Sequence, residues 1–261
     1  MKNLHLFYYS PTGTTQKVVQ EIGNSLDIIP IAEKNLTQPG EGAAVELSDS
    51  DLVIIGMPVY SGRLPETGLE RLKNIHANGT PAVVVVVYGN RDYDDALLEL
   101  SEVAAKSGFV VVAGAAFIGE HSYSTPEKPI AKDRPDQQDL EKCSEFAQLI
   151  TKKISAGWGQ KTPQIPGNHP YKERKPVSAE IHPETDEARC SKCGICVEAC
   201  PTDAITLGET LTTNGHLCTL CCACVKVCPD EARIFDHPAI NTIKDRLFAN
   251  CSARREPEYF L

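Results

Sequence analysis

Apolar runs in the first 155 residues predict a set of short, buried β-strands. Three of the runs are continuous and rich in valine and isoleucine, which is typical of strands covered on both faces of a sheet. The five predicted strands are Leu4–Tyr9, Ile28–Ile31, Asp51–Met57, Ala82–Tyr88 and Phe109–Phe117.

Apolar positions at spacings of three and four predict helices between and after these strands. Such spacing places the apolar side chains on one face of a helix, where they can pack against a sheet. Strands joined by crossover helices predict the fold class α/β, a doubly wound five-stranded parallel sheet. The two clearest stripes are Val18, Val19, Ile22 and Leu26 in a first helix, and Leu140, Cys143, Ala147, Ile150 and Ile154 in a last one.

A segment rich in glycine and proline follows the last helix and resists both helix and strand. It predicts a linker, in which we expect Trp158 and the mostly basic cluster 172–175 to pack and solvate, with docking as the alternative. An apolar stripe near the C-terminus predicts a helical tail that docks on one of the domains. The predicted divisions are a first domain at 1–157, the linker at 158–180, a second domain at 181–237 and the tail at 238–261.

The charge balance narrows the classes of partner. The chain carries 35 acidic and 26 basic residues, a net charge of -9, so we expect neither nucleic acid nor an anionic membrane as a partner. No apolar signal core precedes the first strand, and the longest aliphatic run, Ala82–Val87, is too short to span a bilayer. These features predict a soluble, cytoplasmic protein.

Cysteines form an internal repeat in the last third of the chain. Ten of the eleven follow residue 189, and eight obey the spacing Cys-x2-Cys-x2-Cys-x3-Cys-Pro twice, displaced by 28 residues. This spacing is that of bacterial ferredoxins, in which the fourth cysteine of each motif ligates the other motif's 4Fe-4S cluster. The predicted ligand quartets are Cys190, Cys193, Cys196 and Cys228 for the first cluster, and Cys218, Cys221, Cys224 and Cys200 for the second.

Tetrahedral zinc is the alternative for these cysteines, because zinc sites also use paired Cys-x2-Cys. Two complete quartets, each closed by proline, favour the clusters. Cys222 departs from the repeat, since the equivalent residue is Gly194, which can adopt a positive φ. We therefore expect no shared requirement for a positive φ there, and we expect Cys222, Cys143 and Cys251 to be passive thiols.

A hydroxyl-rich loop directly follows the first predicted strand and opens the first helix. A helix N-terminus offers free amides and the positive end of the helix dipole, so it can hold a phosphate without a lysine or arginine. The loop resembles the phosphate loop of flavodoxins, and an ordinary Ser/Thr helix cap is the alternative. Its candidate ligand-binding residues are Ser10, Thr12, Gly13, Thr14 and Thr15.

Two further loops follow predicted strands at the edge where open α/β sheets bind ligands. In flavodoxins the corresponding loops hold the isoalloxazine ring, so the resemblance implies FMN with Tyr60 and Tyr93 on its faces. Half-buried strand-end tyrosines are the alternative, and Gly62 and Gly89 would let the backbone approach the ring. The candidates are Pro58, Val59, Tyr60, Ser61, Gly62 and Arg63 in one loop, and Tyr88, Gly89, Asn90, Arg91, Tyr93 and Asp95 in the other.

Three charged or titratable side chains near these loops have two possible roles each. A cation at Arg63 or Arg91 would stabilise an anionic reduced flavin, although pairing with surface acids is equally consistent with the sequence. His121, after the fifth strand, is a catalytic candidate as a proton relay, and the alternative is a solvated loop histidine.

The whole chain resembles the fused flavodoxin and ferredoxin proteins of anaerobes, through these loops and the cysteine repeat. The resemblance implies a flavodoxin-like sheet of strand order 2-1-3-4-5, then a small α+β bacterial-type ferredoxin domain. It also implies FMN, two 4Fe-4S clusters and low-potential electron transfer. The implied redox partner is a ferredoxin or another low-potential oxidoreductase.

The predicted function is electron transfer between the clusters and FMN. The alternative is a ferredoxin-dependent flavin reductase acting on a small organic substrate, and a sensory module ranks last because it leaves the loops unexplained. Tyr60 and Tyr93 on both ring faces would favour a carrier, whereas an open face beside His121 or Arg63 would favour a reductase. No Gly-x-Gly-x-x-Gly follows a strand, so a nicotinamide dinucleotide site is not indicated.

Overall fold

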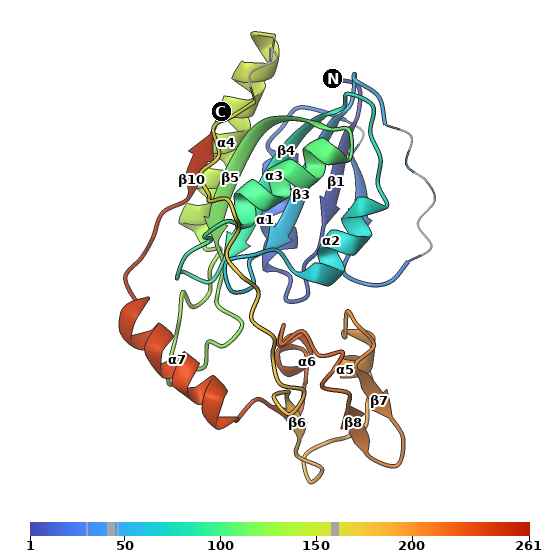
Figure 1. Ribbon diagram of the computed structural model, residues 1–261, viewed down its shortest axis with the longest axis vertical. Coiled ribbons are helices and arrows are strands. Elements are labelled where there is room, and N and C mark those ends of the chain that lie inside the picture. Colours follow the sequence, from blue (N-terminus) through green and yellow to red (C-terminus); the bar gives the residue numbers. More distant parts are fainter. Residues whose placement is uncertain (30, 41–44, 46, 158–161) are drawn as a thin grey trace.

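The computed structural model describes residues 1–29, 31–40, 45, 47–157 and 162–261, and it has an upper α/β part and a smaller lower part (Figure 1). Trp158 and the beginning of the predicted linker lie outside the described residues. Among the residues described, no helix is long and apolar enough to cross a lipid bilayer.

The upper part is built on one six-stranded sheet with the order β10-β5-β4-β3-β1-β2. The five strands β1 to β5 are parallel and lie side by side in the order 2-1-3-4-5, so the predicted flavodoxin-like doubly wound fold is confirmed. The parallel strands are β1 (Leu4–Tyr8), β2 (Ile31–Asn35), β3 (Leu52–Pro58), β4 (Pro81–Tyr88) and β5 (Val110–Ile118).

The edge strand β2 is where the strand prediction was wrong. The expected span ended at Ile31, but the structure begins the strand there and pairs Leu4 with Ile31 and Tyr8 with Asn35. Four of its five residues are exposed, so an apolar run cannot mark it. The sequence also has a proline at position 30, which has no N–H to donate to a ladder.

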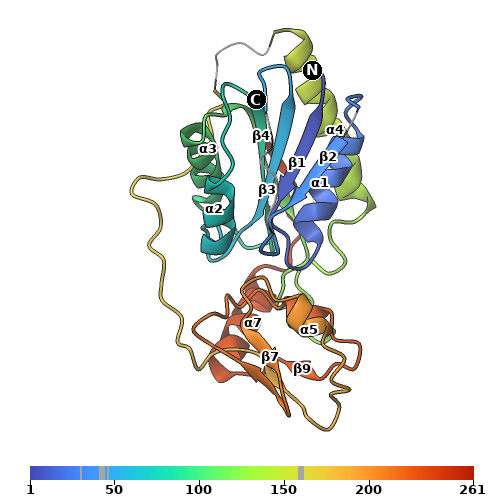
Figure 2. The same ribbon diagram turned by 90° about the vertical axis from the view of Figure 1, so that its right-hand side faces the viewer.

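Helices cover both faces of the sheet (Figure 2). One face buries the predicted stripes of α1 (Thr14–Asn24) and α4 (Gln137–Ser155) against alternate residues of the strands. The opposite face packs against α2 (Glu66–Lys73) and α3 (Ala96–Lys106). Because both faces are covered, the strands read as the continuous apolar runs that predicted them.

The lower part contains two small antiparallel sheets and two short helices. These elements obey the 28-residue repeat, because β6 and β8, α5 and α6, and β7 and β9 occupy equivalent positions. Their bounds are β6 (Glu184–Thr185), α5 (Ile195–Glu198), β7 (Ile205–Leu207), β8 (Leu211–Thr213), α6 (Ala223–Lys226) and β9 (Arg233–Ile234).

The C-terminal tail returns from the lower part to the upper one (Figure 1). It starts with α7 (Pro238–Asn250), the predicted helix, and ends in β10 (Glu258–Phe260), which pairs antiparallel with β5. The apolar stripe predicted α7, and no pattern predicted the strand at the end of the tail. Tyr259 stacks on Phe146 of α4 with ring centroids 4.9 Å apart, and its hydroxyl donates to the Lys142 carbonyl at 2.8 Å.

We predict that Tyr259→Ala lowers the free energy of unfolding by about 1–3 kcal/mol, because it removes a ring that is packed between the tail and α4. Tyr259→Phe should lose only the hydrogen bond, about 0.5–1.5 kcal/mol. Urea denaturation of the full chain measures both, with Phe248→Ala on an exposed side chain of α7 as the control. A Tyr259→Ala protein as stable as the parent would contradict a docked tail.

Candidate cofactor sites

The hydroxyl-rich loop lies between β1 and α1 as predicted. Gly13 is the N-cap of α1 with φ +80°, and the first turn has neither a side-chain cap on that residue nor an acidic side chain. Ser10 Oγ accepts from the Gln16 amide at 3.0 Å, so this hydroxyl does cap the helix. The Thr15 hydroxyl is buried without a hydrogen-bond partner. Amides at a helix start that have no intrahelical carbonyl, beside such a hydroxyl, suit a phosphate.

The second loop is a tight turn at the end of β3. The Tyr60 amide donates to the Arg63 carbonyl at 2.8 Å, and the Arg63 amide returns a bond to the Tyr60 carbonyl at 3.1 Å. Ser61 and Gly62 both have positive φ, as such a turn requires. A Cβ on Gly62 would stand 2.1 Å from Asp94 Oδ2, so this glycine lets the second and third loops approach each other.

A similar close approach joins the third loop to a fourth one, which follows β5 and contains His121. A Cβ on Gly89 would fall 2.4–2.8 Å from the ring and Cβ of His121. We expected Gly62 and Gly89 to admit a ligand, but protein side chains occupy the space beside each. The two glycines therefore hold three strand-end loops together at one edge of the sheet.

These loops line a cavity of about 370 Å³, a size typical of small-molecule sites. Its other walls come from the linker, from α7 and from a loop of the cysteine repeat. Among the predicted residues, the cavity is lined by Ser10, Thr12, Thr14, Thr15, Pro58, Val59, Tyr60, Ser61, Gly62, Arg63, Tyr88, Gly89, Arg91 and His121. Glu173, Arg174, Lys175, Val177, Thr219, Leu220, Cys221, Ile243, Arg246 and Leu247 line it from the C-terminal half.

Three predicted residues of the third loop do not line this cavity. Asn90 Nδ2 donates to the carbonyls of Cys251 and Ala253, at 2.6 and 2.8 Å. The Tyr93 hydroxyl donates to Glu258 at 3.0 Å, and its ring packs in the core. Asp95, like Asn90 and Tyr93, binds a distant segment, as its two carboxylate oxygens accept from the amides of Asn168 and Lys172. These contacts hold the tail and the linker.

The two arginines of the loops are already paired with carboxylates. Arg63 forms a two-pronged bond to Glu99, at 2.7 and 3.0 Å, and lies over the ring of Tyr171. Arg91 pairs with Asp94. Of the two interpretations left open by the sequence, the structure has the ion pairs, and both arginines line the cavity.

His121 lines the cavity in a neutral form. Burial, followed by the charges of Lys226 and Arg91, lowers the pKa of His121 to about 4. Its Nδ1 accepts from the Tyr123 amide at 3.0 Å, so in the neutral ring Nε2 carries the proton. At neutral pH this side chain carries no charge, and it can donate a hydrogen bond from Nε2.

The second predicted quartet of cysteines converges in the structure. Cys200 lines the same small cavity as Cys218, Cys221 and Cys224, although it comes from the other motif. Burial raises the pKa of Cys221 to about 12, so this thiol is protonated until a metal displaces the proton. The cysteines are all free thiols, and among the described residues no three His, Cys, Asp or Glu side chains surround one single-ion position.

The fourth cysteines of the two motifs, Cys200 and Cys228, have equivalent backbone donors. Cys196 of the first quartet lies near both Cys224 and Cys228. The amide of Ala204 donates to Cys200 Sγ at 3.3 Å, and the equivalent amide of Ala232 donates to Cys228 Sγ at 3.2 Å. Amides directed at sulfur suit thiolates that carry negative charge, as cluster ligands do.

The backbone of the repeat is more regular than its sequence. Cys222 has φ +61° and Gly194 has φ +82°, so our expectation of no shared positive φ was wrong. Both residues are N-caps of equivalent short helices, and this position follows the second cysteine of each motif. The loop geometry fixes the conformation, and cysteine adopts it without the freedom of glycine. Two further equivalent pairs have positive φ, namely Lys192 with Leu220 and Asp203 with Glu231.

The two cavities share a wall. Thr219 and Cys221 line both the strand-end cavity and the cysteine cavity. Tyr9 follows β1 and lies beside Cys221, and its buried hydroxyl neighbours the hydroxyl of Thr219. The end of β1 therefore packs against the wall that the two cavities share.

Comparisons with known proteins agree with the lower part of this description. A family described as 4Fe-4S binding domain matches residues 183–206, which contain the whole first cysteine motif. None of the curated proteins compared matches the chain. The chain thus joins a flavodoxin-like α/β fold to a 4Fe-4S binding domain.

Solved flavodoxins resemble the upper part at low identity. An archaeal flavodoxin is 15% identical with a TM-score of 0.43, and oxidised flavodoxin 2 from Bacillus cereus is 23% identical with a TM-score of 0.42. Fusobacterium nucleatum flavodoxin bound to flavin mononucleotide is 17% identical with a TM-score of 0.39. Each alignment covers 59% of this chain and 99% of the other. The fold assignment itself rests on the strand order.

We predict that Cys200→Ala removes the second cluster and leaves the first, because Cys200 lies with the second motif's cysteines. Iron analysis of protein purified without oxygen should fall from about eight to about four per chain. Cys222→Gly is the matched control, since it replaces a buried, non-ligating thiol with the repeat's own equivalent residue, and it should keep all the iron. Full iron in Cys200→Ala would contradict the exchange of cysteines between motifs.

A second prediction concerns pH. Because the folded-state pKa of His121 is about 4, below the ordinary 6.5, protonation favours the unfolded chain. The His121 contribution to stability is therefore complete above pH 6.5 and is lost as the pH falls towards 4. His121→Gln should flatten this part of the Tm against pH curve, and His76→Gln at an exposed position should not. Identical curves for His121→Gln and the parent would contradict a buried neutral ring.

Proposed function

We propose that this chain is an iron–sulfur flavoprotein that passes electrons between two 4Fe-4S clusters and one bound FMN. The single observation that carries the proposal is the wall of Thr219 and Cys221 shared by the two cavities. A ligand of the second cluster would lie at the edge of the flavin cavity. The clusters, which carry one electron at a time, would then be coupled to FMN, which can take one or two electrons.

The strand-end cavity fits FMN in its chemistry. The loop from Ser10 to Thr15 would hold the phosphate through helix amides and hydroxyls. Tyr60, Tyr88 and the glycine-containing turns would surround the ring system. Bound there, FMN would supply one- and two-electron redox chemistry.

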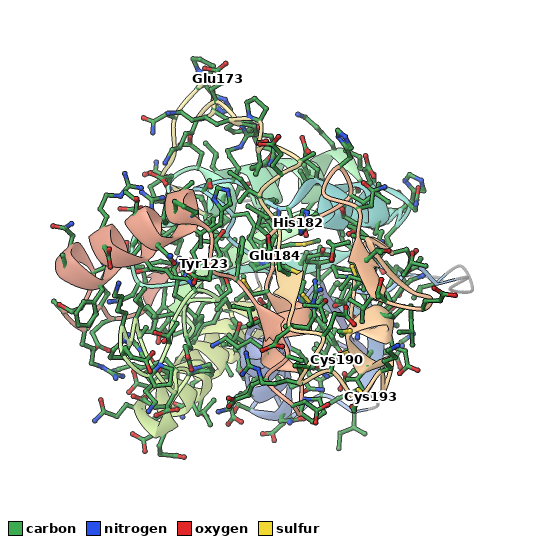
Figure 3. All side chains as sticks on the ribbon, turned by 90° about the horizontal axis from the view of Figure 1, so that it is seen from below. Tyr123, Glu173, His182, Glu184, Cys190 and Cys193 are labelled. Carbon is green, nitrogen blue, oxygen red and sulfur yellow. The ribbon has the colours of Figure 1, made fainter. Side chains whose placement is uncertain are left out.

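The cysteine quartets differ in their exposure, and the difference suggests a route. Cys193 is exposed and Cys190 is partly exposed, and Figure 3 shows the two close together in the view from below. Cys221 is partly exposed as well, but it lines the cavity at the strand-end loops of the α/β part. The first cluster is thus the proposed port for a redox partner protein, and the second is the proposed contact with the flavin.

Side chains from the C-terminal half would limit the access of water to the cavity. Ile243 and Leu247 of α7 line it, together with Leu220 of the cysteine repeat. Apolar groups at this wall keep the dielectric low, which strengthens the polar contacts at the loops. His121 would hold a proton on Nε2 beside the ligand.

One observation keeps a flavin reductase as the second candidate. Tyr60 lines the cavity, but Tyr93 binds the tail, so the expected pair of tyrosines does not enclose a ring. His121 lines the cavity as a neutral hydrogen-bond donor, which would orient a small organic substrate beside the flavin. Oxidation of the reduced protein by small substrates, without a partner protein, would favour this candidate over a carrier.

Protein purified without oxygen should contain about eight irons, a similar amount of acid-labile sulfide and one FMN per chain, the loading of two such clusters and one flavin site. Chemical assay and chromatography of the released flavin measure this. Eight irons with no flavin would contradict the proposed electron transfer between the clusters and FMN. The chain would then be an iron–sulfur protein with another ligand in the cavity.

We also predict that Thr15→Val weakens FMN binding about tenfold, because it removes a hydroxyl that has no partner in the protein and lines the cavity. Thr80→Val is the matched control, since the Thr80 hydroxyl is equally buried and unpaired but lies at the start of β4, outside the cavity lining. Fluorescence titration of the flavin-free protein with FMN compares the two. Equal affinities would remove Thr15 from the phosphate site.

A further inference from the structure

Arg233 of β9 is a buried cation within the cysteine repeat, only 3% exposed. Its guanidinium donates to Thr185 Oγ1 at 2.6 Å, to the Pro183 carbonyl at 2.9 Å and to Thr213 Oγ1 at 2.9 Å. The Nη2 atom also lies 3.8 Å from Cys224 Sγ, within hydrogen-bond range for sulfur. Four anchors thus fix the charge next to one ligand of the second quartet.

This arginine breaks the symmetry of the repeat. The equivalent residue 28 positions earlier is Ile205, which is buried in the apolar core of the lower part. The backbone of the two halves matches at β7 and β9, so the difference lies in the side chain alone. One half of the repeat carries a buried positive charge where the other carries an aliphatic group.

The negative charge that would balance Arg233 comes from cysteine sulfur. Among the described residues, no carboxylate forms an ion pair with it, and its Nε is buried without a partner. A buried guanidinium is costly unless it is paired. Cys224 Sγ is the sulfur atom within hydrogen-bond range of the guanidinium.

We propose that Arg233 is a positioning residue that raises the reduction potential of the cluster held by Cys200, Cys218, Cys221 and Cys224 above that of the other cluster. Reduction adds one negative charge to a cluster, and a fixed cation beside it stabilises the reduced form. The effect is larger for the second cluster, because Arg233 has a hydrogen bond to Cys224 and, among the described residues, none to a cysteine of the first quartet.

The consequence rests on the proposed function. An electron that enters at the exposed first cluster comes to rest on the second, which has the shared wall with the flavin cavity. Since arginine keeps its charge at all ordinary pH values, this bias between the clusters does not depend on pH.

Anaerobic redox titration followed by EPR tests the proposal on the full chain. Arg233→Met removes the charge but keeps a stem of similar length, and Arg233→Lys keeps the charge. We expect Arg233→Met to shift the electron equilibrium between the clusters at least tenfold towards the first, which is 59 mV for a one-electron couple. Arg233→Lys should keep most of the parent's bias. Cys193→Ser, which alters the first cluster's signal, assigns the two signals.

Thr185→Val is the structural control, because it removes one anchor of the guanidinium and leaves the charge in place. Its two potentials should match those of the parent. An Arg233→Met protein with eight irons and unchanged potentials, or with equal shifts in both clusters, would overturn the proposal. The proposed electron transfer from the clusters to FMN, which we call the relay, would be unaffected. Parent protein with fewer than eight irons would overturn the ligand assignment. The relay and the effect of Arg233 on the cluster potential would fall with it.

A second measurement covers the case in which Arg233→Met does not assemble its clusters. Pulsed electron–nuclear double resonance on parent protein labelled with 15N-arginine should show nitrogen coupling to the reduced second cluster. The coupling should disappear in Arg233→Lys, whose side-chain nitrogen is not labelled. The absence of coupling in the parent would overturn the contact between Arg233 and the cluster.

Discussion

The arrangement of the whole molecule depends on the loop that follows β4. Asn90 in this loop binds the carbonyls of the C-terminal tail, and Asp95 binds amides of the linker. The same few residues therefore hold the two chain segments that enter and leave the lower part. With both segments fixed at one edge of the sheet, the cysteine repeat lies against the strand-end loops, and the shared wall between the cavities follows.

The core of the fold could be predicted because its strands are buried on both faces. Ala82–Tyr88 and Phe109–Phe117 read as apolar runs, and the structure has strands there. The two edge strands, β2 and β10, lack such an apolar run, each for a different reason. β2 is mostly exposed and three of its five residues are polar, and β10 is only three residues long. The apolar contacts of Tyr259 with α4 stabilise β10, and no local pattern reveals contacts over such a separation.

The site was predictable as far as it depends on topology. Parallel strands end at one edge, so the loops at Ser10, Tyr60 and Gly89 had to meet there. The partners of individual side chains were not predictable, because Asn90 and Tyr93 bind residues more than 160 positions away. The cysteine motifs carried more information than either, since their spacing alone indicated the exchange of Cys200 and Cys228 between the two quartets.

The most direct measurement of the central claim is the rate of flavin reduction by a reduced bacterial ferredoxin, which is too large to enter the cavity. Stopped-flow absorbance should show the clusters reduced first and the flavin afterwards in the parent. In a Cys200→Ala protein reconstituted with FMN, flavin reduction should be at least tenfold slower. Equal rates in the two proteins would show that electrons reach the flavin without the second cluster, and would contradict the relay.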